Sequence, residues 1–477
     1  MDIQRAVAAL QEVFPSGQIL QPSSDAYKAR NKSYLAGQLN DITPTCIFQP
    51  KDAEEVSKFI CTISSFGISG AVQFAIRGAG NMPLPACSNI QGGITLDLKL
   101  INQVELSKGF VSMGAGAVWL DVDEKVQAAG LGLVGGRSGT GGIGGLALEG
   151  GLSIFSSREG FICDNITDFE VVLASGKIVH ANAKQNSDLW VALKGGSNNF
   201  GVVTRFTMPT FNLGHFWGGN VLYPPPSFPG QIEALVTELQ KVDADPNTHL
   251  MISIGSSARM GGSTLCMNTV YYTQDVENPP VLAPFTAIDS QIKQPGVPKK
   301  LTLTQMASQQ AAGVSNQVRC GYMNLTVKAD VATLQAAVDI YSKSIVPVQS
   351  CKGITCSLTF QPYPVSLLQQ SVAKGGNSLG LDPSTPTVSI LLLTYWEEKS
   401  DDEQITSTMR GALERIREKA VQMGTALDFV YLSYAADFQD PIGSYGAANK
   451  KMLQEVSRKY DPEGLFQKGV PGGFKLF

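Results

Sequence analysis

Long hydrophobic runs, an excess of basic residues and a leader segment are all missing from this sequence of 477 residues. A membrane-spanning helix requires a stretch of about 20 apolar residues without charged side chains. The sequence contains no such stretch. The 37 Lys and Arg against 41 Asp and Glu give a net charge of −4, whereas nucleic-acid binding needs a basic face. No basic segment followed by a long apolar run is found near the first residues, so we expect no signal peptide. These absences predict a cytoplasmic protein that binds neither nucleic acid nor a membrane.

Histidine is scarce, and motifs for metals and nucleotides fail on their context. His180, His215 and His249 lie 35 and 34 residues apart and form no HExxH pair, so we expect no metal site. The eight cysteines are scattered, which is typical of reduced, buried thiols. A GxGxxG pattern at 139–144 is followed by LALEGG, whose glycine pair disfavours the helix that a Rossmann fingerprint needs.

Glycine is the residue in excess, with 49 in 477. It concentrates in two segments about 60 residues apart, AIRGAGNMPLP (75–85) and SGTGGIGGLALEGG (138–151). Without a Cβ, a glycine loop brings backbone N–H groups close to a charged group. Two such loops, with Arg77 beside the first, indicate a clamp for the diphosphate of a dinucleotide, whereas one loop alone would indicate no more than a tight turn.

The pattern of helices and strands changes near residue 210. Before it, strand-like and helix-like segments alternate, and 169–183 predicts a β-hairpin with its turn at Ser175-Gly176. After it, helices such as 330–345 alternate with strands such as 387–396, an α+β pattern that favours an antiparallel sheet. A helix and an ordered coil end the chain. We therefore expect an α+β protein of more than one domain.

Three sequence blocks and the tail carry a resemblance to a known family. They are IRGAGN with SNIQGGITLDL, then GGIGGLALEGGLSIFSSREGFICDNITDFEVVLASGKIV and DLWVALKGGSNNFGVVTRF, and finally SYGAANKKMLQEVSRKYDPEGLFQKGVPGGFKL. Together they cover well over a third of the chain. The sequence resembles the berberine-bridge-enzyme-like FAD-linked oxidoreductases of fungal secondary metabolism, which are vanillyl-alcohol-oxidase or PCMH-type flavoproteins.

The resemblance implies a domain plan and a set of cofactor residues. Residues 1–210 would form a two-subdomain PCMH-type FAD-binding domain, 211–430 an α+β substrate domain with a large antiparallel sheet, and 431–477 a segment that returns to the FAD domain. The residues implied to bind FAD are Arg77, Gly78, Ala79, Gly80, Asn81, Met82, Thr140, Gly141, Gly142, Ile143, Gly144, Gly145, Val202, Tyr445 and Asn449.

The sequence departs from the family where relatives attach the flavin. Many relatives end the first loop with a histidine bonded to the flavin, and this chain has Asn81 there; some carry a cysteine in the second loop, and this chain has none. The resemblance therefore implies non-covalent FAD. Ala79 and Glu149 also replace glycines, and Glu149 puts an acid near a diphosphate, which is unfavourable unless its side chain points away.

The resemblance also implies chemistry: hydride transfer from a small natural product to flavin N5, re-oxidation by molecular oxygen and a tyrosine as base. Tyr434 and Tyr431 are the candidate catalytic residues, and Phe360, Gln361, Tyr395 and Trp396 are the candidate substrate residues. Three readings stay open. The first is an FAD-dependent oxidoreductase that oxidises, dehydrogenates or oxidatively cyclises its substrate. The second is a cyclase or pericyclase of Diels-Alder type with FAD structural or absent, and the third is a flavin-free binding protein.

Overall fold

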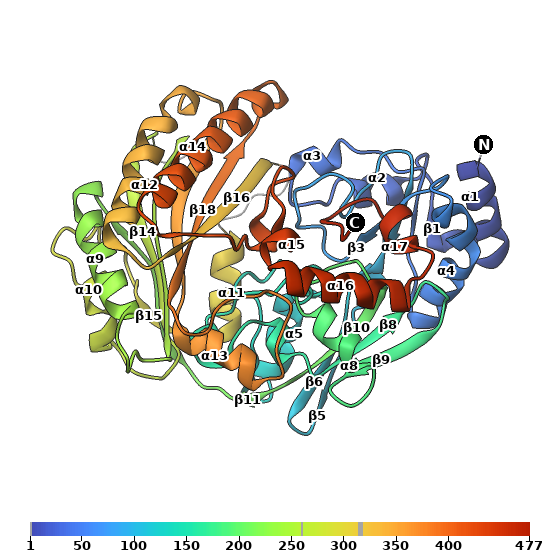
Figure 1. Ribbon diagram of the computed structural model, residues 1–477, viewed down its shortest axis with the longest axis horizontal. Coiled ribbons are helices and arrows are strands. Elements are labelled where there is room, and N and C mark those ends of the chain that lie inside the picture. The colour runs from blue at the N-terminus through green and yellow to red at the C-terminus, as the bar shows by residue number, and fades with distance from the viewer. Residues whose placement is uncertain (1, 259–260, 313–317) are drawn as a thin grey trace.

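The computed structural model describes residues 2–258, 261–312 and 318–477. It has an α+β architecture, as expected, and its described residues form two large hydrophobic cores and a small cluster around Tyr34. Figure 1 shows the N-terminal part and the tail on one side and the large sheet with its helices on the other. No described helix is both long and apolar enough to cross a lipid bilayer.

The first subdomain is built on a small mixed sheet. Strands β2, β4 and β3 pair in parallel, and β1 pairs antiparallel with β2. Helix α4 begins where the Asp52 side chain accepts a hydrogen bond from the N–H of Glu55, which satisfies a free N-terminal donor. The described elements are β1 (Ile19–Leu20), β2 (Cys46–Phe48), β3 (Phe74–Arg77), β4 (Ile94–Asp97), α1 (Asp2–Val13), α2 (Asp25–Asn31), α3 (Gly37–Asn40) and α4 (Ala53–Ile68).

The second subdomain contains an antiparallel sheet in the order β5-β6-β10-β8-β9 among the described strands. Its β8–β9 hairpin confirms the predicted one, and Gly176 takes the positive φ of +78° that the turn requires. The elements are β5 (Val104–Ser107), β6 (Phe110–Gly114), β7 (Leu131–Gly132), β8 (Asp168–Val172), β9 (Ile178–Asn182), β10 (Val202–Pro209), β11 (Phe211–Asn212), α5 (Trp119–Gln127), α6 (Ile143–Leu146), α7 (Ser156–Glu159) and α8 (Ser187–Leu193).

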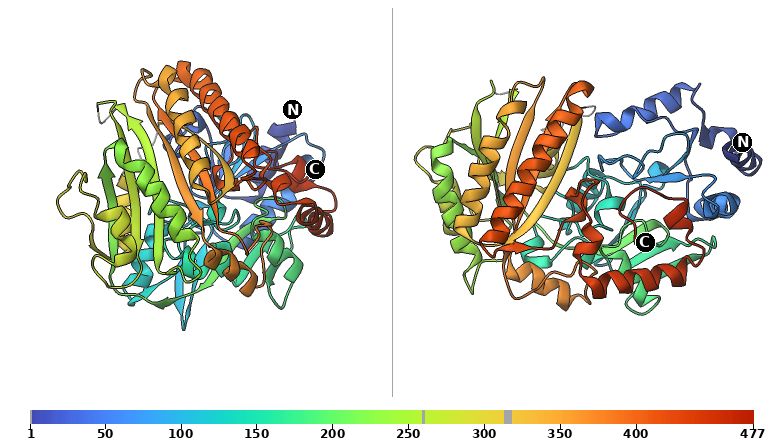
Figure 2. Two further views of the ribbon diagram at one scale, coloured as in Figure 1. Left: turned by 60° about the vertical axis from the view of Figure 1, so that its left-hand side comes forward. Right: turned by 45° about the horizontal axis from the view of Figure 1, so that its top comes forward.

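The large sheet is antiparallel at every described pairing and runs in the order β15-β12-β14-β13-β17-β18-β16-β19. Helices α9, α12 and α14 cover one of its faces, as Figures 1 and 2 show. The strands are β12 (Phe216–Tyr223), β13 (Thr248–Ser257), β14 (Thr264–Tyr272), β15 (Lys299–Leu301), β16 (Arg319–Lys328), β17 (Thr355–Tyr363), β18 (Thr387–Trp396) and β19 (Ala426–Leu427). The helices are α9 (Phe228–Leu239), α10 (Ala283–Thr286), α11 (Leu303–Ala312), α12 (Val331–Ser344), α13 (Val365–Ala373) and α14 (Asp402–Gln422).

The tail leaves the large sheet and packs on the first two subdomains. Its helices are α15 (Pro441–Ser444), α16 (Ala447–Tyr460) and α17 (Leu465–Lys468). Helix α16 contacts α8, and α17 contacts α4. Leu453, Phe466 and Phe474 belong to the N-terminal core. The tail therefore stabilises the N-terminal domain by burying apolar side chains there, while the domain bounds at 210 and 430 stay predictions.

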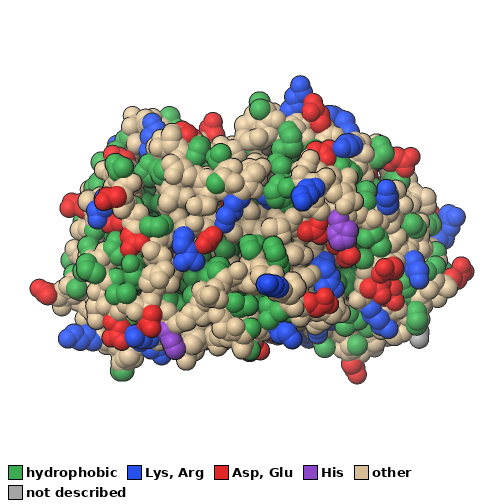
Figure 3. Space-filling view, turned by 90° about the horizontal axis from the view of Figure 1, so that it is seen from below, with side chains coloured by type: hydrophobic (Ala, Val, Ile, Leu, Met, Phe, Trp, Pro, Cys, Tyr) green, Lys and Arg blue, Asp and Glu red, His purple; other side chains and the backbone are tan. Residues whose placement is uncertain are grey.

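Charged residues do not segregate on the face seen in Figure 3. Lys and Arg side chains are interspersed there with Asp and Glu side chains. This mixing agrees with the small net charge of −4.

Candidate functional site

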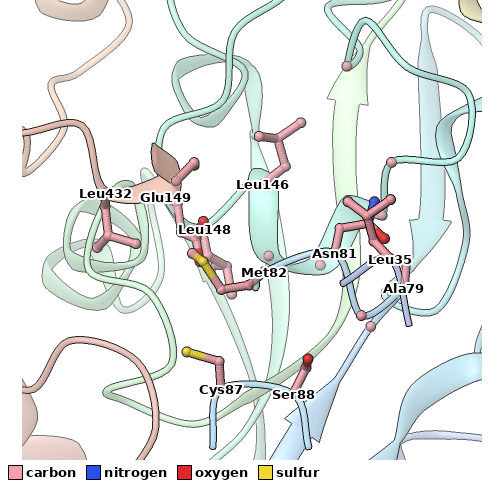
Figure 4. Close-up of a pocket in the computed structure, with 18 of the residues that line it drawn as sticks. Leu35, Ala79, Asn81, Met82, Cys87, Ser88, Leu146, Leu148, Glu149 and Leu432 are labelled. Carbon is pink, nitrogen blue, oxygen red and sulfur yellow. The ribbon is translucent and has the colours of Figure 1, made fainter. Parts of the chain in front are cut away.

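A cavity of about 430 Å³ lies where the two glycine loops meet the large sheet. The first loop, the second loop and the 3₁₀ turn Leu432–Tyr434 supply its walls together with β13, β14, β16 and β18. Figure 4 shows Leu35, Ala79 and Asn81 together on one side of the cavity, and Met82 beside Leu148 and Glu149. The spacing of the glycines thus predicts correctly that both loops line one site.

The first loop presents unpaired backbone donors. The N–H groups of residues 79–82 donate to no hydrogen bond within the described chain. Gly80 has a φ of +80°, and a Cβ there would lie 2.7 Å from Cδ1 of Tyr34. Only glycine fits this position, which keeps the loop close to the cavity. A run of free N–H groups is suited to bind an anion.

The second loop packs directly against the first. A Cβ on Gly142 would lie 2.6 Å from the Cβ of Ala79, and one on Gly144 would lie 2.9 Å from the carbonyl oxygen of Ala115. Asn81 Nδ2 donates to the Thr140 carbonyl oxygen at 3.1 Å. The glycines therefore let the two loops close into a single cradle, and Asn81 bridges them.

Arg77 does not supply the positive charge that we expected beside the diphosphate. Its guanidinium is fully buried and donates to the carbonyl oxygens of Arg30 at 2.9 Å and Ser33 at 3.0 Å. It also stacks 3.5 Å from the ring centroid of Tyr34. Carbonyl oxygens accept from both Nη atoms and the Tyr34 ring covers the guanidinium, whereas Nε has no partner among the described residues. The side chain does not line the cavity.

Three other implied cofactor residues lie outside the cavity wall, whereas Val202 lines it. Ile143 is fully buried in the core. The Tyr445 hydroxyl donates to the Gly195 carbonyl oxygen at 3.1 Å, and Asn449 Nδ2 donates to the Tyr445 carbonyl oxygen at 3.0 Å. These side chains hold the tail in place, which is a structural task.

Glu149 does face the cavity. Burial raises the pKa of its carboxyl from 4.5 to about 7, and the nearby hydroxyls of Ser433 and Ser197 offset the rise in part. Cys87 lines the cavity too, and burial raises the pKa of its thiol to about 12. Figure 4 shows both side chains in the part of the cavity near Met82.

Sequence reasoning missed Arg137. Its Nη2 donates to the Tyr434 hydroxyl oxygen at 2.7 Å and to Gln361 Oε1 at 3.1 Å, and its Nη1 lies 3.1 Å from the sulfur of Met251. Arg137 is the sole basic residue between Lys125 and Arg158 and lies inside the glycine-rich region. That isolated charge was the signal available in the sequence.

The two candidate catalytic tyrosines occupy different environments. Tyr434 is partly buried at the cavity wall, with Arg137 on its hydroxyl. Tyr431 is buried, and its hydroxyl accepts a hydrogen bond from the Gly151 N–H at 2.9 Å. Burial raises the pKa of Tyr431 well above its usual value, so it is a poor candidate for a base. Its ring packs at 5.0 Å, edge to face, against Tyr434.

The four candidate substrate residues divide according to strand alternation. Tyr395 lines the cavity, whereas its neighbour Trp396 donates to Asp402 at the start of α14. Phe360 stacks on Phe228 in the core beneath the helices. Gln361 faces the other way and accepts from Arg137. Successive side chains of a strand point to opposite faces, so the structure does not place Phe360 and Trp396 in the pocket.

Fold and site together define a PCMH-type FAD-linked oxidoreductase. Residues 44–182 match a family described as "FAD binding domain". The chain is 34% identical over 463 residues to the FAD-dependent monooxygenase tpcD of Cochliobolus heterostrophus, covering 93% of this chain and 87% of the relative. It is 33% identical over 440 residues to the bifunctional solanapyrone synthase of Alternaria solani, covering 91% and 82%. The chain belongs to the berberine-bridge-enzyme-like family of FAD-linked oxidoreductases.

Solved structures have the same fold. 6-Hydroxy-D-nicotine oxidase of Arthrobacter nicotinovorans matches with a TM-score of 0.77 and 18% identity, covering 96% of this chain and 98% of the other. Glucooligosaccharide oxidase of Acremonium strictum matches with a TM-score of 0.78 and 17% identity, covering 97% of each chain. The latter is described as carrying a 6-S-cysteinyl, 8α-N1-histidyl FAD.

The residues present fit FAD. The free N–H groups of 79–82 can donate hydrogen bonds to the oxygens of a diphosphate, and the close-packed glycines leave the cradle open to it. Among the described lining residues Arg137 is the one cation and Glu149 the one anion. The diphosphate charge would therefore be stabilised chiefly by backbone dipoles.

Proposed function

We propose that this chain is an FAD-dependent oxidoreductase that oxidises, dehydrogenates or oxidatively cyclises a small, largely apolar natural product. The observation that carries the proposal is a cradle of free N–H groups opening on the same cavity as the Arg137–Tyr434 pair. The fungal relatives named as FAD-dependent monooxygenases and as a bifunctional synthase support a place in secondary metabolism.

We propose that FAD is held without a covalent bond. Asn81 ends the first loop, and neither loop contains histidine or cysteine. Cys87 lines the cavity, but its raised pKa of about 12 keeps it a thiol, whereas the thiolate is the nucleophile. Acid precipitation of the purified protein is expected to leave the flavin in the supernatant. Flavin that stays with the precipitate would refute this.

Tyr434 is the proposed proton acceptor. Bound FAD would supply a two-electron acceptor for the substrate's hydride. The guanidinium of Arg137, 2.7 Å from the Tyr434 oxygen, stabilises negative charge on that oxygen. The ring of Tyr431 fixes the orientation of Tyr434 from behind. Such a positioned base contributes about 10²–10⁴-fold to a rate.

The flavin absorbance spectrum and the yield of hydrogen peroxide test the proposal. The purified protein is expected to show a flavin spectrum that substrate bleaches under anaerobic conditions. Molecular oxygen is the proposed final electron acceptor, so an oxidase would yield one hydrogen peroxide per substrate, whereas oxygen insertion would yield less. A colourless protein that free FAD cannot reconstitute would overturn the oxidoreductase proposal.

A cyclase on the same scaffold is the second candidate. The similarity to a protein named a synthase favours it, as does the aromatic wall formed by Tyr322 and Tyr395. Such an enzyme would fold its substrate in the cavity and carry out no net redox chemistry. Turnover without bleaching and without peroxide would support the cyclase.

A further inference from the structure

Arg137 lacks an anionic partner. It forms no ion pair with any described carboxylate, and its three partners Tyr434, Gln361 and Met251 are all neutral. A guanidinium has five N–H donors, so these three contacts leave two donors without an acceptor in the part of the chain that the structure describes. Arg319 is buried and pairs with Asp41 and Asp402. Arg77 is buried too, but it is held by carbonyl oxygens and the ring of Tyr34 and does not line the cavity.

The side chains around Arg137 do not carry a compensating charge. His249 is buried, and burial together with Arg137 lowers its pKa to about 3, so it is neutral. Tyr271 and Tyr363 are also within the influence of Arg137, and burial raises the pKa of both. On the cavity wall beside them, Thr269, Gln310, Tyr322 and Tyr395 are uncharged. Arg137 is half-buried at the cavity wall, and none of these described side chains neutralises its charge.

We propose that Arg137 binds an acidic oxygen of the substrate, a phenolic or enolic hydroxyl that is ionised when bound. This inference rests on the proposed function, because it names the substrate class of the same site. The substrate oxygen has lost its proton to solvent before it binds, so no covalent bond forms or breaks on binding and no electron is transferred. Tyr434 keeps its proton, and the N–H donors of Arg137 that have no acceptor in the described chain stabilise the negative charge on the substrate oxygen.

A pair of matched probes tests the inference without turnover. 4-Nitrophenol, ionised at pH 8, and neutral 4-nitroanisole have nearly the same shape, and the phenolate reports its own ionisation by absorbance. We expect the protein as purified to bind the phenolate at least about 10-fold more tightly than the ether, because one charge-assisted hydrogen bond stabilises by about 1.5–3 kcal/mol. Equal binding of the two probes would overturn the inference.

Three variants test whether the preference for the phenolate over the ether depends on the Arg137 side chain. Arg137→Met keeps the length without the charge and is expected to lose the preference, Arg137→Lys to keep part of it, and Tyr434→Phe to retain it. Thermal melting shows whether each variant is folded. An Arg137→Met protein that keeps the probe ratio while the reduction potential of its FAD changes would assign the arginine to the flavin instead and overturn the inference. Because no redox step is involved, failure of the oxidoreductase proposal would leave the probe ratio intact.

Discussion

Replacing Glu149 with glutamine is expected to strengthen FAD binding above pH 7 and to remove most of its pH dependence. Glu149 is the one carboxylate among the described cavity-lining residues, and burial raises its pKa to about 7. FAD would bring two phosphate charges into the same cavity. The ionised carboxylate opposes that charge, so the cofactor should bind to the protonated form.

The magnitude follows from this pKa. If binding requires the neutral carboxyl, the apparent Kd is multiplied by about 1.1 at pH 6, about 2 at pH 7 and about 11 at pH 8. The sign is fixed by the direction of titration, because the carboxyl gains its charge as pH rises through about 7. In Glu149→Gln we expect this factor to vanish.

Equilibrium titration of FAD-free protein, followed by quenching of flavin fluorescence, measures the effect from pH 6 to 8. Lys475→Met is the control, since burial lowers the Lys475 pKa to about 7 and this amine titrates in the same range without lining the cavity. A wild-type affinity that is constant across this range, or a Glu149→Gln protein with the wild-type slope, would refute the reasoning.

The same carboxyl predicts how the stability of the FAD-free protein depends on pH. Its folded-state pKa of about 7 lies above the ordinary 4.5, so its stabilising contribution is complete below pH 4.5 and is lost as pH rises to 7. The loss is at most about 3 kcal/mol at 1.36 kcal/mol per pH unit, and solvent in the cavity reduces it. Thermal melts at pH 5 and pH 8 are expected to differ less in Glu149→Gln than in the wild type.

Four further substitutions test the site. In Gly142→Val the added Cβ would lie 2.6 Å from the Cβ of Ala79. We therefore expect thermal melting to show about 1–3 kcal/mol of lost stability and the purified protein to carry less flavin. Unchanged flavin content would contradict the close packing of the two loops. Arg77→Met leaves buried carbonyl oxygens unpaired, so we expect the free energy of unfolding to fall by about 3 kcal/mol while the folded fraction binds FAD as the wild type does. Weaker FAD binding by a folded variant would indicate that the Arg77 charge acts on the diphosphate after all. Tyr434→Phe is expected to slow substrate-dependent flavin reduction about 100-fold, whereas Tyr431→Phe loses about 1 kcal/mol of stability and keeps the rate; equal slowing would argue against Tyr434 as the base.

The spacing of glycines in the sequence was enough to locate the two loops of the cradle, because their close packing depends on residues without a Cβ. Gly80 and Gly142 can be identified as loop glycines from the sequence, and the structure gives each a steric reason. The direction in which a side chain points was harder to predict. Arg77 lies beside the first loop in the sequence, yet it points into the interior, where carbonyl oxygens accept its hydrogen bonds.

The sequence by itself determined the α+β class, the two loops and the absence of anchoring residues from them, because each is a property of short segments. Tertiary structure alone decided which side chains face the cavity. Neighbouring strand residues such as Tyr395 and Trp396 point to opposite faces, and only the packing of helices on one face says which is which. Arg137 meets Gln361 and Tyr434 across 224 and 297 residues of chain. No local pattern encodes such a contact, since it exists only once the second glycine loop, β17 and the turn Leu432–Tyr434 have packed together.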